Sequence, residues 1–445
     1  MPVRQRAPSG TPFAPISAIQ REPSGCPSPR SKELAVNATL ATRHSTLREE
    51  PTLTSPKATR AAPTSGPGSG PTQTAPSPAT EARRSQLTDG PHEPLLTDSL
   101  TDPLTQLSRF LARLSFERDD PLAVGDALRA LVDAGFDRLP LPGQGRTLER
   151  WRMLGAVAER DLGLVKLFEG HTDALAILAE LRADAPPSGS RWGVWAAEAP
   201  EVRLRIQRRE DNVSRHDEVD LFGTKAWCSG AASLTHALVT CRDSADRPQL
   251  VAVALEQPGV RISTRNWHAV GMAATASAEV HFEHVRAHLV GAPGAYVSRP
   301  GFWHGGGGIA ACWFGAAQML AHTLHAAAKD KRDSHRSAHL GAVDVALDSA
   351  AAVLRETAAW IDRTPRADPI RPVLRARLQV EQAATAILEH ACRALGAGPL
   401  CRDEAFAHCA ADLPVFLRQS HAERDLAALG DLLAQQEHDN LGWKL

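Results

Sequence analysis

The sequence predicts an α+β protein in which helical segments lie on both sides of a unit of short strands. Apolar residues recur at helical spacing between about 104 and 181, and again between about 309 and 429. From about 190 to 290, short apolar runs alternate with Gly, Pro and Asp, which is typical of strands and turns. We therefore expect a helical domain over 96–188, a middle β-domain over 189–298 and a second helical domain over 299–445.

The first 95 of the 445 residues are rich in Pro, Ser, Thr, Gly and Arg and contain almost no sustained apolar run. Such a composition cannot bury enough apolar surface to offset the entropy of ordering, so we predict a disordered tail over 1–95. A transit segment and an over-called start codon have the same composition and stay open as alternatives. The remaining chain of about 350 residues is long enough for two or three packed units.

Charge and cysteine content limit the classes of function. Lys and Arg number 50 against 51 Asp and Glu, a formal net charge of −1, and the two signs are interspersed. This argues against a nucleic-acid groove and a polybasic membrane surface. No apolar run reaches the length of a membrane span, and the seven cysteines form no C-x-x-C pair. We expect a cytoplasmic protein.

Two motifs in the middle segment carry the chemistry. Residues 223–231 read GTKAWCSGA and alternate like a strand, which places Trp227 and Ser229 on one face. An indole and a hydroxyl side by side can hold a flat, electron-poor ring by packing on its face and bonding its edge. Residues 271–285 read GMAATASAEVHFEHV. Together the two runs resemble the middle domain of the acyl-CoA dehydrogenase superfamily, and the resemblance extends over roughly 104–430.

The resemblance implies a fold, a cofactor and an activity. The middle domain would be β-barrel-like and the C-terminal domain a four-helix bundle. FAD would carry out α,β-dehydrogenation of an acyl thioester or related carbonyl compound, for an electron acceptor that stays open. Relatives assemble as homodimers or homotetramers. Two alternatives remain: a flavin-dependent monooxygenase on the same fold, and a non-catalytic, degenerate member.

The resemblance also assigns residues. Trp227 matches the tryptophan at the flavin ring, Ser229 the hydroxyl at its N5 edge, and Thr275 lies with them near the substrate. Gly396 and Gly398 match a glycine loop that approaches the dinucleotide of a neighbouring subunit. A helix C-cap is the other interpretation of Gly396.

Several family elements are missing. Residues 195–200 (WAAEAP) lack the family's G-S-D phosphate loop, and residues 336–341 (RSAHLG) lack its phenylalanine. The position of the usual glutamate base, counted from Asp412, is Ser420, whose hydroxyl is too weak a base.

The nearest replacements for the missing base are His421 and Glu423. If this segment is helical, Glu423 shares the face of Ser420 and His421 points away from it. Glu423 suits a dehydrogenase, His421 suits a monooxygenase, and a solvated helix face is the third interpretation.

Other polar groups are weaker candidates. Residues 305–308 (GGGG) precede a predicted helix, and together with Arg299 and His304 they could bind a phosphate or simply allow close packing. The pairs His335 with His339 and His322 with His325 have metal-compatible spacing but no further ligands, so we interpret them as exposed helix residues. For His171, a capped or exposed role is favoured over contact with substrate.

Overall fold

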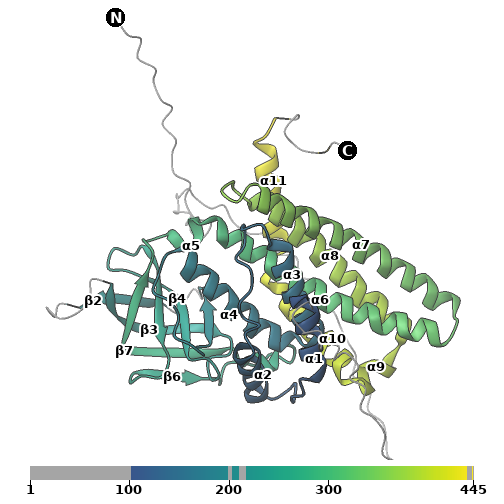
Figure 1. The fold of residues 1–445 in the computed structure, drawn as a ribbon, viewed down its shortest axis with the longest axis horizontal. Coiled ribbons are helices and arrows are strands. Elements are labelled where there is room, and N and C mark those ends of the chain that lie inside the picture. Colours follow the sequence, from purple (N-terminus) through teal and green to yellow (C-terminus); the bar gives the residue numbers. More distant parts are fainter. Residues whose placement is uncertain (1–101, 199–202, 210–216, 438–442, 444–445) are drawn as a thin grey trace, which may run out of the picture. The chain divides into compact units, whose positions relative to one another are not determined.

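The computed structural model describes residues 102–198, 203–209, 217–437 and 443. The predicted tail over 1–95 lies outside the described residues. Helices, then strands, then helices follow one another along the described chain, which confirms the α+β prediction (Figure 1). The helices before the sheet are α1 (Pro103–Arg113), α2 (Pro121–Asp133), α3 (Thr147–Arg160) and α4 (Leu162–Glu180).

The middle segment forms a barrel-like sheet. Strand β4 pairs with β2, β2 with β3, β3 with β7, β7 with β5, and β5 again with β4, so these five strands close on themselves. β1 extends the sheet beside β4, and β6 pairs with β7. The strands are β1 (Trp192–Trp195), β2 (Leu204–Arg208), β3 (Glu218–Cys228), β4 (His236–Arg242), β5 (Pro248–Ala254), β6 (Val260–Ser263) and β7 (Ala278–Val290).

The last third of the described chain is helical. α6 packs against both α7 and α8, and α10 lies against α6. The elements are the short α5 (Ala295–Ser298), α6 (Pro300–Asp330), α7 (Ser334–Arg363), α8 (Ile370–Leu395), α9 (Ala397–Arg402), α10 (Glu404–Phe416) and α11 (Glu423–Ala434). Among the described residues, α7 alone is long and apolar enough to cross a membrane. Length and composition by themselves are weak evidence for a span.

Local sequence signals explain where the helices begin. α1, α2, α4, α7 and α10 each follow an aspartate whose carboxylate accepts a backbone N–H of the first turn, and α6 begins with a proline at its first position. The capping carboxylate satisfies a donor that has no partner within the helix. The prediction that α6 begins near Ile309 is wrong, because Pro300 starts it nine residues earlier. Residues 305–308 therefore lie inside the helix, where their N–H groups are not free.

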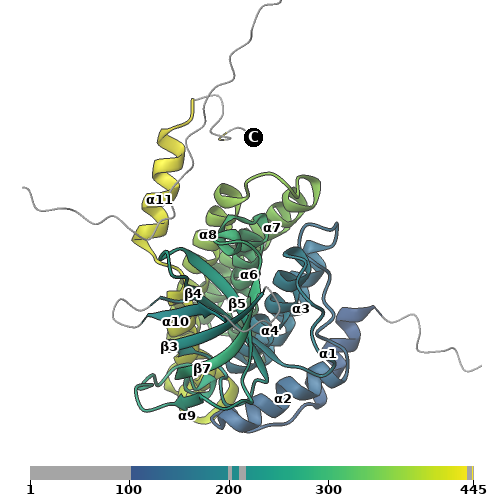
Figure 2. The same ribbon diagram turned by 90° about the vertical axis from the view of Figure 1, so that its left-hand side faces the viewer.

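The helical pattern predicted up to about residue 429 is interrupted near its end. α10 ends at Phe416, a short 3₁₀ turn covers Leu417–Gln419, and α11 begins only at Glu423. Between them the Ser420 hydroxyl accepts from the N–H of Ala422, and Asp425 accepts from the N–H of His421. Side chains that bond nearby backbone groups compete with the helical ladder, which is why one helix becomes two. Figure 2 shows α11 projecting away from the rest of the helical bundle.

α3 and α6 cross at two glycines. A methyl group at Gly315 would lie 2.1 Å from the carbonyl oxygen of Gly155, so the backbones touch directly. This crossing fixes the N-terminal helices to the longest helix of the bundle.

A second contact joins the bundle to the barrel. The buried Asp412 carboxylate of α10 accepts the N–H of Met272, at the start of the turn that leads into β7. Beside it, a methyl group at Gly271 would lie 2.0 Å from the carbonyl oxygen of Ala411. Burial raises the pKa of Asp412 from 3.8 to about 6. This contact is called the Asp412–Met272 junction below.

The Gly315→Ala variant should be less stable than the wild type. The added methyl group must push α3 and α6 apart, which costs about 1–3 kcal/mol of unfolding free energy. Gly341→Ala in α7 is the matched control, since no atom lies within 4 Å of its added methyl group. Alanine there should stabilise the helix by up to about 1 kcal/mol. Denaturant unfolding measures both variants, and equal effects would contradict the close crossing.

The Asp412→Asn variant should change how stability depends on pH. The pKa of Asp412 is about 6 in the fold and has its ordinary value of 3.8 in the unfolded chain, so between these values the folded state binds more protons. The stability that protonated Asp412 contributes is therefore fully present below the unfolded pKa and is lost as pH rises through the folded pKa. The free energy of unfolding falls by about 3 kcal/mol at most over this interval. Asparagine keeps the bond to Met272 and removes the titration. The wild type should lose stability relative to Asp412→Asn across this interval, and a constant difference would contradict the raised pKa.

Candidate functional site

Three hydroxyls form a chain at the end of the barrel. Ser229 Oγ lies 2.8 Å from Ser277 Oγ, which lies 3.0 Å from Thr275 Oγ1. Thr275 Oγ1 donates to the Met272 carbonyl oxygen at 2.8 Å. A carbonyl only accepts and each hydroxyl carries one proton, so all three bonds form together only when Ser229 donates to Ser277, Ser277 to Thr275, and Thr275 to Met272. Ser229 Oγ keeps lone pairs for a ligand but has no donor left.

The backbone around this hydroxyl chain is also held. The N–H of Gly230 donates to the Thr275 carbonyl at 2.7 Å, and Trp195 Nε1 donates to the Ser229 carbonyl at 3.2 Å. Thr275 is fully buried. The structure thus brings together Ser229 and Thr275, two residues that sequence reasoning placed at one site, and adds Ser277, which it missed. Ser277 stands in the second motif but is one of several small residues there, so no signal distinguished it.

Trp227 lies next to the hydroxyl chain on an irregular part of β3. The pairing of β3 with β7 shifts between Lys225 and Cys228, and Trp227 takes a left-handed backbone conformation with φ of 57°. The prediction that Trp227 and Ser229 share a face of a regular strand is therefore wrong, because a bulge intervenes and the strand ends at Cys228. The indole is 56% exposed, which leaves a large apolar ring free to stack on a ligand.

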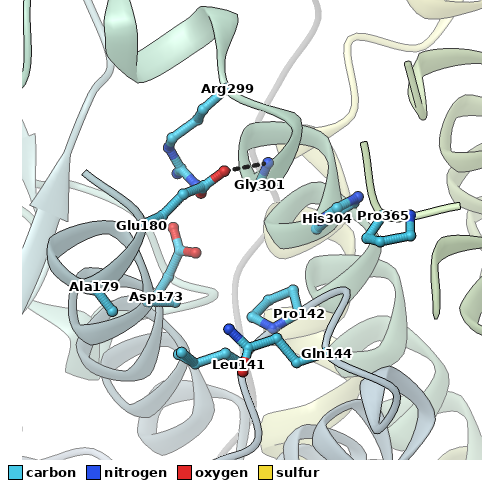
Figure 3. A pocket seen from close by; sticks show the side chains of 11 residues that line it. Leu141, Pro142, Gln144, Asp173, Ala179, Glu180, Arg299, Gly301, His304 and Pro365 are labelled. Carbon is cyan, nitrogen blue, oxygen red and sulfur yellow. Dashed lines mark hydrogen bonds and ion pairs between the residues drawn. The ribbon is translucent and has the colours of Figure 1, made fainter. Parts of the chain in front are cut away.

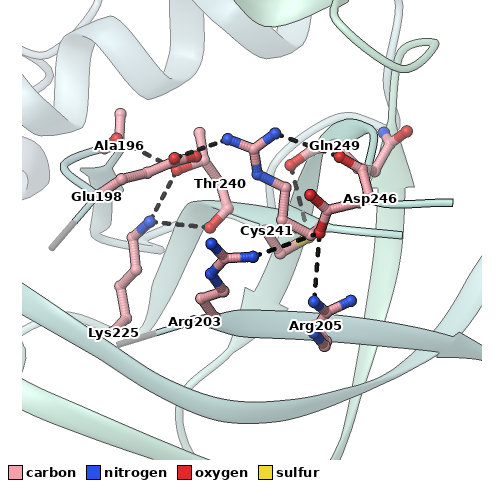
Figure 4. A network of polar contacts seen from close by, with 10 residues as sticks. Ala196, Glu198, Arg203, Arg205, Lys225, Thr240, Cys241, Asp246 and Gln249 are labelled. Atoms are coloured by element: carbon pink, nitrogen blue, oxygen red, sulfur yellow. Dashed lines mark hydrogen bonds and ion pairs between the residues drawn. The ribbon is translucent and has the colours of Figure 1, made fainter. Parts of the chain in front are cut away.

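Lys225, also on β3, links this strand to β4. It is buried, and its Nζ donates to the carbonyl and the hydroxyl of Thr240 on β4, at 2.9 and 2.8 Å (Figure 4). The Thr240 hydroxyl in turn donates to the Ala196 carbonyl at 3.2 Å. Burial lowers the pKa of Lys225. This network ties the segment after β1 to the barrel, and sequence analysis gave Lys225 no role although it stands within the first motif.

Of the two glycines of the predicted glycine loop, Gly396 lies at the junction of α8 and α9, and Gly398 lies in the first turn of α9. Gly396 ends α8 with φ of 67°, and both Gly396 and Gly398 are exposed, with no atom within 4 Å of an added methyl group. The C-cap interpretation of Gly396 is confirmed. Contact of these glycines with a neighbouring subunit's cofactor stays a prediction.

Of the three candidates for the catalytic base, Ser420 is buried, whereas His421 and Glu423 are exposed. Ser420 is 2% exposed, and its hydroxyl lies 3.5 Å from Asp425. Since residues 420–422 are not helical, the expectation that Glu423 lies one helical turn above Ser420 is wrong. Arg377 holds this segment by donating to the Gln419 carbonyl at 3.0 Å.

The histidines show no metal site. Among the described residues, no group of three or more His, Cys, Asp or Glu side chains is placed to hold a metal ion. His322 contacts Glu159, and His339 contacts His390. His171 is buried, with Nδ1 accepting the N–H of Trp192 and Nε2 near Asp137. It therefore stabilises the packing of α4 on β1. The prediction of a capped or exposed His171 is wrong, because the side chain is buried.

Comparison with known proteins agrees with this fold. Residues 203–285 match the family model described as "Acyl-CoA dehydrogenase, middle domain". No curated protein matches the sequence. Several solved structures share the fold, at identities below 20%.

Dibenzothiophene monooxygenase TdsC from Paenibacillus sp. A11-2, in complex with FMN and indole, is 19% identical, covers 75% of this chain and 96% of its own, and has a TM-score of 0.62. Methanesulfinate monooxygenase MsuC from Pseudomonas fluorescens is 19% identical over 76% of this chain and 98% of its own, with a TM-score of 0.63. The nitrososynthase from Micromonospora carbonacea var. africana is 16% identical over 75% and 97%, with a TM-score of 0.62.

Both sequence motifs lie inside the matched range and contain the residues of the hydroxyl chain. The order of helices and strands continues the likeness on both sides. The chain thus matches the acyl-CoA dehydrogenase middle domain over residues 203–285 and shares the overall fold of these solved structures.

Proposed function

We propose that the protein is a flavin-dependent oxidoreductase that binds reduced flavin and oxygenates a small organic molecule. The direction of the hydroxyl chain carries this proposal. Reduced flavin has a hydrogen on N5 and oxidised flavin does not. Ser229 Oγ can accept that hydrogen but has no proton to donate to oxidised N5, because its own proton is directed at Ser277.

The surroundings of Ser229 suit an isoalloxazine ring. Trp227, two residues before Ser229, presents an exposed indole, and the bonds to Gly230 and Trp195 hold the backbone of this segment in place. The residues present therefore fit a flavin with Trp227 against the ring and Ser229 at its edge. Bound reduced flavin would supply two electrons to dioxygen, of which one oxygen atom enters the product and the other leaves as water.

The segment around Ser420 argues against the dehydrogenase activity that the family resemblance implied. Removal of a proton next to a carbonyl needs a base of suitable pKa within hydrogen-bond reach of the substrate. The Ser420 hydroxyl accepts the N–H of Ala422 and lies beside Asp425, and His421 and Glu423, the candidate replacements, are both exposed in this chain. Dehydrogenation by Glu423 remains the second candidate, because α11 has no buried residue and could be covered in an assembly.

The similar structures support the choice. TdsC and MsuC are named as monooxygenases, and a third is a nitrososynthase. TdsC is described with FMN and indole, and KijD3 with FMN and an amino sugar nucleotide. We accordingly propose a small-molecule substrate and a flavin that is FMN or FAD. A homodimer or homotetramer stays a prediction, for which the exposed length of α7 offers surface.

Ser229→Ala should remove a preference for reduced flavin. The wild type should bind reduced FMN or FAD more tightly than the oxidised form, since only the reduced form donates to Ser229. Loss of one neutral hydrogen bond should lower that preference by about three- to tenfold. Anaerobic equilibrium titration measures both affinities, with Ser349→Ala on α7 as the control. Trp227→Ala should weaken both redox forms alike, and an unchanged preference in Ser229→Ala would contradict the assignment.

The two candidate activities separate in one experiment. With reduced flavin supplied and ¹⁸O₂ present, a panel of sulfinates, aromatic heterocycles and amino sugars should yield a product labelled with one oxygen atom. His421→Ala should lower this yield if His421 takes part, and Glu423→Gln should not. If acyl thioesters instead reduce the oxidised flavin without oxygen, and Glu423→Gln abolishes that reduction, the protein is a dehydrogenase. Protein that binds no flavin in either form is the degenerate member.

A further inference from the structure

A polar cavity of about 140 Å³ lies between the C-terminal half of α4 and the first turns of α6. The loops after α2 and α7 close its other sides (Figure 3). Its polar lining consists of Gln144, Asp173, Glu180, Arg299 and His304. An apolar cavity of about 150 Å³ is known to accept benzene, so this volume suits a ligand of roughly six non-hydrogen atoms.

The start of α6 is not available to an anion. Glu180 already accepts the N–H of Gly301 at 3.1 Å, and it forms an ion pair with Arg299 at 2.6 Å. A carboxylate at a helix N-terminus takes the place that a phosphate would occupy. The phosphate site considered near residues 305–308 is therefore excluded for two reasons: these residues lie inside α6, and Glu180 occupies the start of that helix. A ligand of this cavity must instead donate hydrogen bonds to the acceptor that remains, Asp173.

Asp173 is the acceptor without a partner. Its carboxyl group accepts no hydrogen bond from the described residues, although Arg299 is close enough to act on its charge. Burial raises the pKa of Asp173, and the charge of Arg299 partly opposes that rise. The other nearby cations are engaged: Lys166 pairs with Glu169 at 3.4 Å, and Arg150 donates to the Pro140 carbonyl. Figure 3 shows the Asp173 carboxyl group facing the same space as Glu180.

Two further polar atoms in the cavity wall lack partners. Arg299 and His304 are 7% and 3% exposed, and neither Arg299 Nε nor His304 Nε2 has a hydrogen bond within the part of the chain that the structure describes. An unsatisfied buried polar atom costs about 1–3 kcal/mol. Burial also lowers the pKa of His304, so its ring is neutral. Both residues line the cavity, so its wall is polar on the α6 side, although these two atoms are themselves enclosed by protein.

We propose that this cavity binds a small primary amine that also carries a hydroxyl group. Its ammonium group donates to the Asp173 carboxylate, and its hydroxyl bonds the polar wall formed by Gln144 and His304. Leu167 of α4 packs at Gly230, next to Ser229, and Asp173 follows six residues later, about 9 Å along the helix axis. The amine site is therefore near the hydroxyl chain but shares no residue with it.

Calorimetric titration of the flavin-free, full-length chain tests the amine site. 3-Amino-1-propanol should bind, and 1,3-propanediol, which has a hydroxyl in place of the ammonium group, should bind at least about tenfold more weakly. Propionate and inorganic phosphate should not bind. Tight binding of either anion, equal binding of the diol, or no binding of the amine to the wild type would each overturn the proposal.

Variants locate the binding. Asp173→Asn should weaken 3-amino-1-propanol by at least about tenfold, because the charge is lost while the size is kept. Asp344→Asn, an exposed aspartate on α7, is the matched control and should leave the affinity unchanged. Ala179→Leu, which narrows the cavity without touching a charge, should also abolish binding and serves if Asp173→Asn does not fold. Unchanged affinity in both cavity variants would overturn the site. Since no flavin is present, failure here is separate from failure of the proposed function.

Discussion

The Asp412–Met272 junction is the contact on which the candidate site depends. A buried carboxylate from the helical bundle holds the first N–H of the turn at 272–276, and that turn carries Thr275 and leads to Ser277. Met272 and Ala276 both take left-handed conformations, with φ of 59° and 39°. Non-glycine residues adopt such conformations only where the surrounding structure holds them. The bundle thus sets the geometry of hydroxyls that belong to the barrel.

One carbonyl then determines the chemistry offered to a ligand. The Met272 carbonyl oxygen can only accept, so with all three bonds formed the proton order along Thr275, Ser277 and Ser229 is set, and Ser229 ends the chain as an acceptor. Dehydrogenation also needs a catalytic base. At the position where the family resemblance expects a glutamate base, this chain has the buried Ser420. In the proposed function, the same fold thereby favours reduced flavin as the bound form.

Sequence alone predicted the fold class and the order of helices and strands, because periodicity is a local property. The family resemblance assigned Ser229 and Thr275 to one site, and the structure brings these two side chains together, while their role stays a prediction. Sequence alone could not predict the bulge at Trp227, the buried Lys225 bond to Thr240 or the break at residues 420–422. Each depends on partners distant in sequence or on side chains that compete with the backbone. The start of α6 was missed for a different reason: Pro300 is a helix-start signal that the glycine run obscured.

The midpoint potential of the bound flavin tests the central claim most directly. A protein that binds the reduced form more tightly raises the potential of the flavin above its value in solution. Spectroelectrochemical titration of the full-length protein with FMN or FAD should therefore give a potential more positive than that of the free flavin, and Ser229→Ala should move it back. A bound potential below the free value would contradict an acceptor at N5 and the proposed use of reduced flavin.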